Sequence, residues 1–216
     1  MEFSREIRTD TASARGQVYG LLASVFRSEP DKEFLQELKG PRFAGAFASL
    51  EADFGKDFRQ SSEEELRENL AIEFTRLFMG PGEHISPHES IFVDVDGDGG
   101  GLYGAKTVEV KKFIETTGLT YDDSFTGLPD HVSVELEFMS KLAGFESRKW
   151  DSGDDEAAKY CLSVQKMFAE KHLLKWIPEF CEQVIVKADL PFYREMARVT
   201  SEFVDFDYDS IGASLN

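Results

Sequence analysis

Residues 62–81 read S-E-E-E-L-R-E-N-L-A-I-E-F-T-R-L-F-M-G-P, and the fold class is clearest in this stretch. Ser62 and Glu65 form a capping box, in which the serine hydroxyl accepts a first-turn amide and the glutamate reaches back to the serine. The apolar residues that follow recur at three- and four-residue spacing and end before Gly80: Leu66, Leu70, Phe74, Leu77 and Phe78. This spacing predicts an amphipathic helix.

The same helical spacing recurs along most of the chain. It predicts helices over residues 11–27, 107–118, 129–142, 157–168, 177–185 and 192–204, with shorter ones near 34–38 and 43–54. Thr107 and Asp130 are predicted N-caps, Pro178 a first-turn residue and Gly118 a C-cap. No segment shows the alternation of a strand. We therefore expect an all-α fold, a single globular, helical bundle-like domain of about nine helices over residues 1–216.

Residues 80–104 interrupt this pattern. The stretch is rich in glycine and carries Pro81 and Pro87, and its one short apolar patch is Ile91-Phe92-Val93. A structureless connection of this length is uncommon in a compact domain and marks a functional loop or a hinge. We expect a long central loop that joins two halves of the domain, residues 1–79 and 105–216.

The charge of the chain narrows the choice of partners. Of its 216 residues, 41 are Asp or Glu and 24 are Lys or Arg, which gives a net charge of −17. Phosphate binding needs clustered Lys and Arg, so nucleic acid and anionic lipid surfaces are excluded as partners. An acidic surface instead suits a basic partner, because opposite charge speeds the encounter.

Two further features predict the compartment. Cys161 and Cys181 are the only cysteines, which excludes a disulfide scaffold. The N-terminus lacks the basic and apolar regions of a signal peptide, and no apolar run approaches the roughly 20 residues that a membrane helix needs. We expect a cytoplasmic protein without membrane insertion.

Two patterns invite a metal ion. Asp94–Gly99 begins like a calcium loop, but its twelfth position, which should hold a bidentate glutamate, is Ala105. His84 and His88 are four residues apart, yet the prolines around them disfavour the helix that would place both on one face. The sequence also offers no nucleophile elbow and no phosphate-binding loop. One enzymatic alternative stays open, a metal-dependent all-α hydrolase that uses the four histidines His84, His88, His131 and His172.

Two clusters carry more specific information. The first is F-x-x-L-F-x-G-P at 74–81 with P-x-E-S at 87–90, and the second is P-D-H-x-x-x-E-L-E-F-M at 129–139. Together they resemble the TorD/DmsD-like family, the cytoplasmic chaperones for molybdenum enzymes of the dimethyl sulfoxide reductase superfamily, which are related to the nitrate reductase assembly chaperones. A weaker similarity follows at residues 168–178, so the resemblance covers most of the chain.

The resemblance implies a binding protein and not an enzyme. Members of the family recognise the twin-arginine signal peptide of a molybdopterin-containing oxidoreductase subunit and hold that subunit for cofactor insertion before export. An acidic surface beside an apolar groove suits the basic and apolar regions of such a leader. The resemblance implies no resident cofactor and no metal, with transient contact to the molybdopterin cofactor or a nucleotide left open. It also leaves open which reductase or dehydrogenase is the client.

The motif match assigns nine residues to binding of the signal peptide and client: Leu77, Phe78, Pro87, Glu89, Ser90, Pro129, Asp130, His131 and Glu135. Asp130 and Glu89 are expected to accept hydrogen bonds from the arginines of the leader. Leu77 and Phe78 are expected to line an apolar groove or the core, and His131 to orient Asp130 or bind the peptide. The family often places a bulky residue at the position of His88, so this chain departs from it there.

Two questions remain open at this level. The long loop, together with the family's tendency to swap segments, predicts a monomer or a segment-swapped homodimer. The second alternative function is a generic protein-interaction scaffold, which would bind partners without specificity for a leader peptide.

Overall fold

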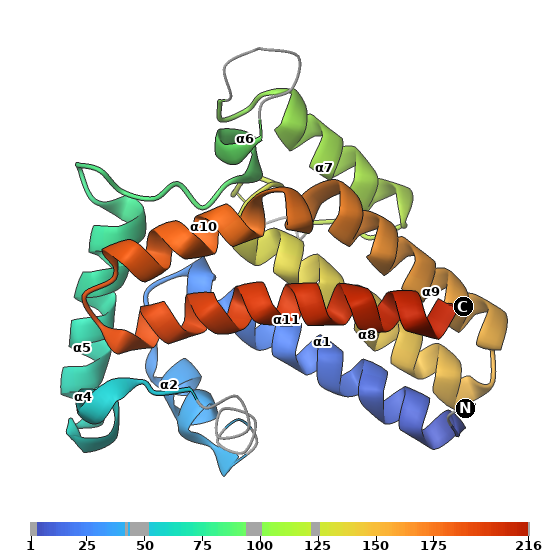
Figure 1. The fold of residues 1–216 in the computed structure, drawn as a ribbon, viewed down its shortest axis with the longest axis horizontal. Coiled ribbons are helices and arrows are strands. Elements are labelled where there is room, and N and C mark those ends of the chain that lie inside the picture. The colour runs from blue at the N-terminus through green and yellow to red at the C-terminus, as the bar shows by residue number, and fades with distance from the viewer. Residues whose placement is uncertain (1–3, 42, 44–51, 94–100, 122–125, 216) are drawn as a thin grey trace.

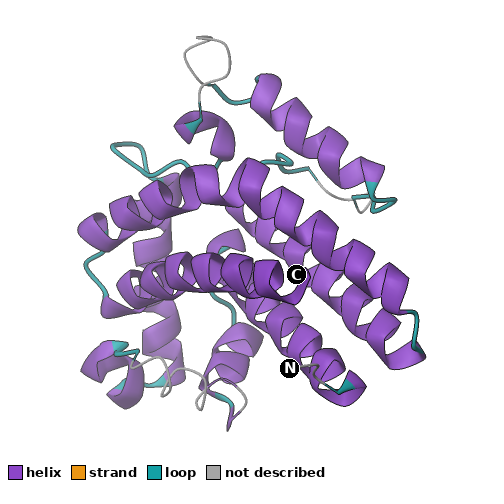
Figure 2. Cartoon of the chain, turned by 45° about the vertical axis from the view of Figure 1, so that its right-hand side comes forward, coloured by secondary structure: helices purple, strands orange, loops and turns teal. Residues whose placement is uncertain are grey.

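The computed structural model describes residues 4–41, 43, 52–93, 101–121 and 126–215, and these residues are helical almost throughout (Figures 1 and 2). No strand occurs within them; the single β-type pairing is an isolated antiparallel bridge between His88 and His131. The predicted all-α class is confirmed. The acidic stretch that resembles a calcium loop lies in residues 94–100, outside the described part.

The helices follow one another along the chain with short connections. They are α1 Arg5–Arg27, α2 Lys32–Lys39, α4 Gly55–Gln60, α5 Glu63–Phe74, η1 Thr75–Met79, α6 Glu89–Phe92, α7 Ala105–Thr116, α8 Val132–Ser152, α9 Asp155–Phe168, η2 Ala169–Leu173, α10 Leu174–Lys187 and α11 Pro191–Leu215. The two segments marked η are wider π-helical turns. One continues α5, and the other joins α9 to α10.

Most predicted helix ends agree with the structure. The Ser62 hydroxyl accepts the amide of Glu65 at 3.2 Å. Gly118 follows α7 with a φ of 81°, the left-handed conformation that favours glycine at a helix end. The predicted Thr107 cap is wrong, since α7 begins at Ala105 and its N-cap is Gly104. The predicted start at Ile177 is also wrong.

Helix α10 begins at Leu174, which places Pro178 inside the helix as its fifth residue. A proline at this position lacks the amide that would bond to the Leu174 carbonyl. The π-helical turn η2 lies directly before this point, so the helix is irregular on the N-terminal side of the proline. The sequence predicted two separate helices here because it read the proline as a start signal.

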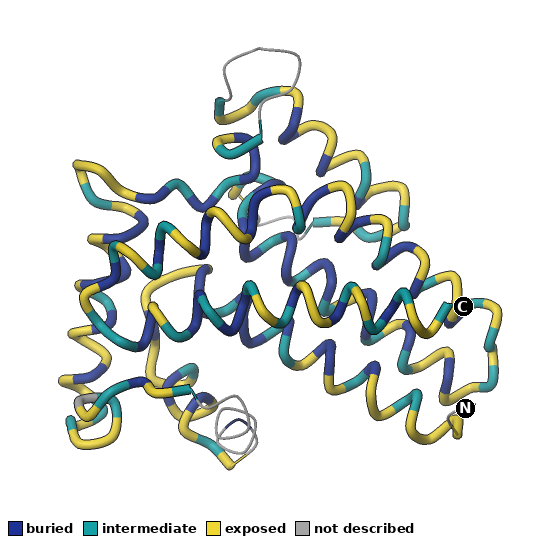
Figure 3. Tube along the Cα trace, viewed as in Figure 1, coloured by how far each residue is buried: buried dark blue, intermediate teal, exposed yellow. Residues whose placement is uncertain are grey.

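The arrangement in space is a bundle of long helices with smaller elements at one side. Helix α1 packs along α8, α8 packs on α9, and α10 packs on α11 (Figure 1). Helices α6 and α7 lie beside the middle of this bundle, away from α2 and α4. The faces that meet inside the bundle are buried (Figure 3). Because α1 and α8 come from the two predicted halves, the halves are interleaved here, and the hinge between them stays a prediction.

A polar network lies inside the bundle, close to where both ends of the chain lie. Arg15 of α1 donates to Asp207 of α11, to Glu146 of α8 at 2.8 Å and to Gln165 of α9 at 2.6 Å. Tyr19 adds a hydrogen bond to Asp207 at 2.9 Å. All five residues are buried, so one guanidinium connects four helices with every charge paired.

Candidate functional site

The two sequence clusters meet at the His88–His131 bridge. The Glu89 amide donates to the Asp130 carbonyl at 2.9 Å, and the Val132 amide donates to the Pro87 carbonyl at 2.8 Å. These two bonds fix the P-x-E-S segment directly against the start of α8. Four motif segments far apart in the sequence therefore become one structural unit, as the motif match implied they would act together.

Asp130 lies inside this junction. Its side chain is 0% exposed, and its Oδ2 accepts the Ser90 amide at 3.1 Å. The predicted role of Asp130 as the N-cap of α8 is wrong. His131 is the cap, and its Nδ1 accepts the Ser133 amide at 3.1 Å. The carboxylate instead spans two segments and holds the first turn of α6.

Glu89 is the centre of a second set of contacts. Its side chain is 0% exposed, and its Oε2 lies 2.9 Å from Nδ1 of His172 in η2. Its Oε1 lies 3.8 Å from Nζ of Lys106 in α7, a residue that is itself buried. A carboxylate with these neighbours is directed into the protein and not toward a partner at the surface.

Glu135 lies beside Glu89 and is also completely buried. Its Oε2 accepts the indole N–H of Trp176 at 3.0 Å. Burial and the neighbouring charge of Glu89 raise the pKa of Glu135 well above its ordinary value, because both disfavour the ionised form. Glu135 is therefore protonated under conditions in which an exposed glutamate is ionised.

His88 and His131 are half-buried and form the part of the junction that reaches solvent. Their rings meet edge to face with centroids 5.0 Å apart. Burial lowers the pKa of both imidazoles, and the neighbouring His88 contributes to lowering that of His131 to about 4. Both rings are neutral at pH 7, and a neutral Nδ1 is what the His131 cap requires, since a protonated nitrogen cannot accept.

The histidines do not form a metal site. His84 is exposed and contacts the Gly82 carbonyl, while His172 is buried against Glu89. Within the described ranges, no group of three or more histidine, cysteine or acidic side chains has the geometry to hold a metal ion. The geometry therefore gives no support to the hydrolase alternative.

Leu77 and Phe78 lie in the π-helical turn η1, and both are buried. The Phe78 ring contacts the rings of Phe26, Phe74 and Phe180, so it belongs to the core. The Leu77 carbonyl accepts the Ile85 amide at 2.7 Å, which ties η1 to the loop that leads to the bridge. Both π-turns of the described chain thus adjoin this region, and such turns are frequent at functional sites.

Glu73 holds the other side of η1. Its carboxylate accepts the amides of Asp189 and Leu190 at 2.6 and 3.2 Å, and it pairs with Arg76 at 2.8 Å. These bonds fix the turn between α10 and α11 against the F-x-x-L-F motif. Glu73 is buried, and the sequence gave no signal for this contact because the partners are backbone amides more than a hundred residues away.

The structure brings seven of the nine predicted residues to one junction: Pro87, Glu89, Ser90, Pro129, Asp130, His131 and Glu135. It places Leu77 and Phe78 in the adjoining core. Sequence reasoning missed Lys106 and Trp176, and it considered His172 only as a metal ligand. The spacing of His172 and Trp176, one helical turn apart, was the available signal, since it places both on one face.

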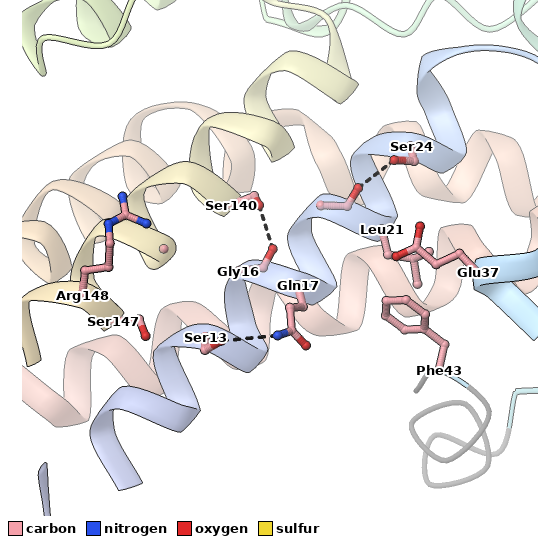
Figure 4. Close-up of a pocket in the computed structure, with 12 residues that line it drawn as sticks. Ser13, Gly16, Gln17, Leu21, Ser24, Glu37, Phe43, Ser140, Ser147 and Arg148 are labelled. Atoms are coloured by element: carbon pink, nitrogen blue, oxygen red, sulfur yellow. Dashed lines mark hydrogen bonds between the residues drawn. The ribbon is translucent and has the colours of Figure 1, made fainter. Parts of the chain in front are cut away.

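A cavity of about 560 Å³ lies elsewhere, along the groove between α1 and α8 (Figure 4). Its floor is formed by small residues, and the Ser140 hydroxyl donates to the Gly16 carbonyl at 2.7 Å across the two helices. A Cβ on Gly16 would lie 3.2 Å from the Ser140 carbonyl oxygen, so this close approach needs glycine. None of the nine predicted residues lines the cavity.

Known proteins resemble this chain over nearly its full length. The chaperone protein TorD of Shewanella loihica is 26% identical over 95% of this chain and 97% of its own. The chaperone protein TorD of Photobacterium profundum is 25% identical over 89% of this chain and 92% of its own. A crystal structure of a protein assigned to redox enzyme maturation in Archaeoglobus fulgidus matches with a TM-score of 0.52 and 23% identity, over 88% of this chain and 93% of that one.

These comparisons define the class: the protein is an all-α chaperone and not an enzyme. The model of the nitrate reductase delta subunit family matches residues 40–182. The chain belongs to that family, and it is TorD-like, as the sequence motifs predicted. In the described part of the chain, no helix is both long enough and apolar enough to cross a membrane.

Proposed function

We propose that this chain binds the twin-arginine signal peptide of a molybdopterin-containing oxidoreductase subunit in the cytoplasm and holds that subunit for cofactor insertion before export. The observation that carries the proposal is the His88–His131 bridge, which assembles both family motifs into one junction with two neutral imidazoles at its edge. Membership of a family whose relatives are named TorD chaperones supports the same reading.

The burial of the junction defines how its residues take part. Asp130, Glu89 and Glu135 are each 0% exposed, so in this conformation they position the two segments and do not meet the leader directly. This revises the expectation that Asp130 and Glu89 accept hydrogen bonds from the arginines. Direct contact falls to residues that reach solvent, foremost His131.

The surface beside His131 combines apolar and acidic groups. We call the half-buried residues Leu128, His131, Val134 and Glu137 the His131 face. Glu137 pairs with Arg27 of α1 at 2.6 Å, and its side chain is 42% exposed. A guanidinium of the leader can take the place of Arg27 on this carboxylate, while Leu128 and Val134 offer apolar contact. The net charge of −17 favours the encounter with a basic leader.

Amide hydrogen exchange with a synthetic leader tests this location. Binding should slow exchange at residues 84–90 and 128–137 and leave residues 155–166 of α9 unchanged. The variant His131→Ala should weaken leader binding by about 1–3 kcal/mol, the range for losing a partner of a charged hydrogen bond. His84→Ala is the matched control, because His84 is exposed and lies outside the bridge, and it should bind as the unmodified chain does.

Protection confined to the α1–α8 groove would place the leader elsewhere and contradict the His131 face. Equal loss of binding in His131→Ala and His84→Ala would show that the effect is not specific to the bridge. A generic scaffold predicts neither the localised protection nor the difference between the two variants.

A further inference from the structure

Four elements converge on Glu89, and each contributes one buried side chain. Glu89 belongs to α6, Lys106 to α7, Glu135 to α8 and His172 to η2. All four are no more than 8% exposed. The segment that carries Glu89 also contacts the chain at residue 101, where the Gly101 amide donates to the Ser90 carbonyl at 3.1 Å. The position of this segment thus depends on what holds the Glu89 side chain.

His172 and Trp176 hold the two carboxyl groups side by side. They lie one helical turn apart, His172 contacting Oε2 of Glu89 at 2.9 Å and Trp176 donating to Oε2 of Glu135 at 3.0 Å. The two carboxyl groups lie within hydrogen-bonding reach of each other. The remaining oxygen of each, Oε1, is buried and has no hydrogen-bond donor when both groups are ionised.

The charges around the pair do not compensate two ionised carboxylates. Lys106, 3.8 Å from Glu89, is shared with Glu109 at 2.7 Å. Asp130 and the Tyr121 hydroxyl lie within electrostatic reach of Glu135 and add no positive charge. Two carboxylates cannot hydrogen-bond to each other, but a carboxylic acid can donate to a carboxylate. A single proton removes the repulsion and supplies the missing donor.

We propose that Glu89 and Glu135 share one proton, which resides on Glu135, and that Glu135, His172 and Lys106 are positioning residues that hold the 87–92 segment on the helical bundle. In this arrangement the Glu135 acid donates to Glu89, while His172 and Lys106 supply the hydrogen and the positive charge that Glu89 needs as an anion. The inference concerns the free protein and does not depend on the identity of the client.

The direction of the pH dependence follows from the raised pKa of Glu135, which burial and the charge of Glu89 cause. A carboxyl whose pKa is higher in the folded than in the unfolded state stabilises the fold at low pH. Its contribution is lost as the pH rises through the folded-state value. Attachment of the 87–92 segment should therefore weaken toward alkaline pH, the opposite of what an ordinary buried ion pair of a carboxylate gives.

Infrared spectroscopy of the full chain at pH 7 tests the proton directly. Exposed carboxyl groups are ionised at this pH, so a C=O stretch of a protonated carboxyl reports a buried acid. We expect this band in the unmodified protein and its loss in Glu135→Gln. Glu146→Gln is the matched control and should retain the band, because Glu146 is also buried and also accepts a tryptophan indole, but pairs with Arg15.

Absence of the band in the unmodified protein would overturn the shared proton. Persistence of the band in Glu135→Gln would overturn its assignment to Glu135.

The positioning role has its own readout in amide exchange at Glu89 and Ser90, measured relative to core amides of α11. A glutamine at 135 keeps a donor for Glu89, whereas leucine removes it. We expect Glu135→Gln to exchange as the unmodified chain does at pH 6 and more slowly than it at pH 8.5. Glu135→Leu should exchange at least about tenfold faster at both pH values, as for a locally opened segment. Equal exchange in the glutamine and leucine variants would contradict the role.

Discussion

Arg15→Met is expected to lower the free energy of unfolding by about 3–5 kcal/mol, the largest stability effect of any single change proposed for this chain. The guanidinium bonds to Asp207, Glu146 and Gln165, all buried, so methionine leaves two carboxylates without their cation. Denaturant unfolding measures the loss as a lower midpoint at an unchanged slope.

Arg198→Met is the matched control for this change. Arg198 also pairs with two carboxylates, Glu195 at 2.9 Å and Glu202 at 2.8 Å, but on the surface of α11. Surface pairs of this kind contribute about 0–1 kcal/mol. Equal losses in the two variants would show that burial does not strengthen the Arg15 network. Replacing Asp207 and Glu146 by leucine in the Arg15→Met background should recover stability, because no buried charge then lacks a partner.

Phe78→Ala is expected to destabilise the fold by about 3–5 kcal/mol, the usual cost of truncating a buried phenylalanine. Its ring packs against Phe26, Phe74 and Phe180, and only 6% of the residue is exposed. Thermal or denaturant unfolding checks the value. Met79→Ala, at the neighbouring residue that is 66% exposed, should stay within about 0.5 kcal/mol of the unmodified chain.

The Phe78 result also decides between the two roles that the motif leaves open. A large loss of stability identifies a core residue. Unchanged stability combined with lost leader binding would instead mean that the side chain lines a groove that opens for the peptide, and would contradict the packing described here.

The fold class could be predicted from the sequence because each helix carries its own signal. The apolar stripe from Leu66 to Phe78 and the Ser62 cap depend on residues within a few turns of one another. Helix ends failed where a tertiary contact competed with the local rule. Asp130 satisfies the local preference for an N-cap, but its carboxylate is used by Ser90, forty residues away, and His131 takes the cap.

The candidate site was predictable in membership more than in mechanism. Motif spacing identified Glu89, Asp130 and Glu135, and all three lie at one junction. The sequence could not show that they are buried, because acidic residues are mostly exposed and burial depends on partners from other elements. Lys106 and Trp176, which hold Glu89 and Glu135, come from α7 and α10 and carry no motif of their own.

The central claim is that the chain recognises a twin-arginine leader. Its most direct test is a calorimetric titration of the full chain with the synthetic leader of the molybdopterin oxidoreductase encoded beside it. A Lys-Lys version of the peptide is the control, and both are titrated at two salt concentrations. Guanidinium groups bond to carboxylates in a paired geometry that ammonium groups cannot reproduce. We predict micromolar or tighter binding that weakens with the Lys-Lys peptide and with added salt. Equal binding of the two peptides, or binding of neither, would contradict recognition of the leader.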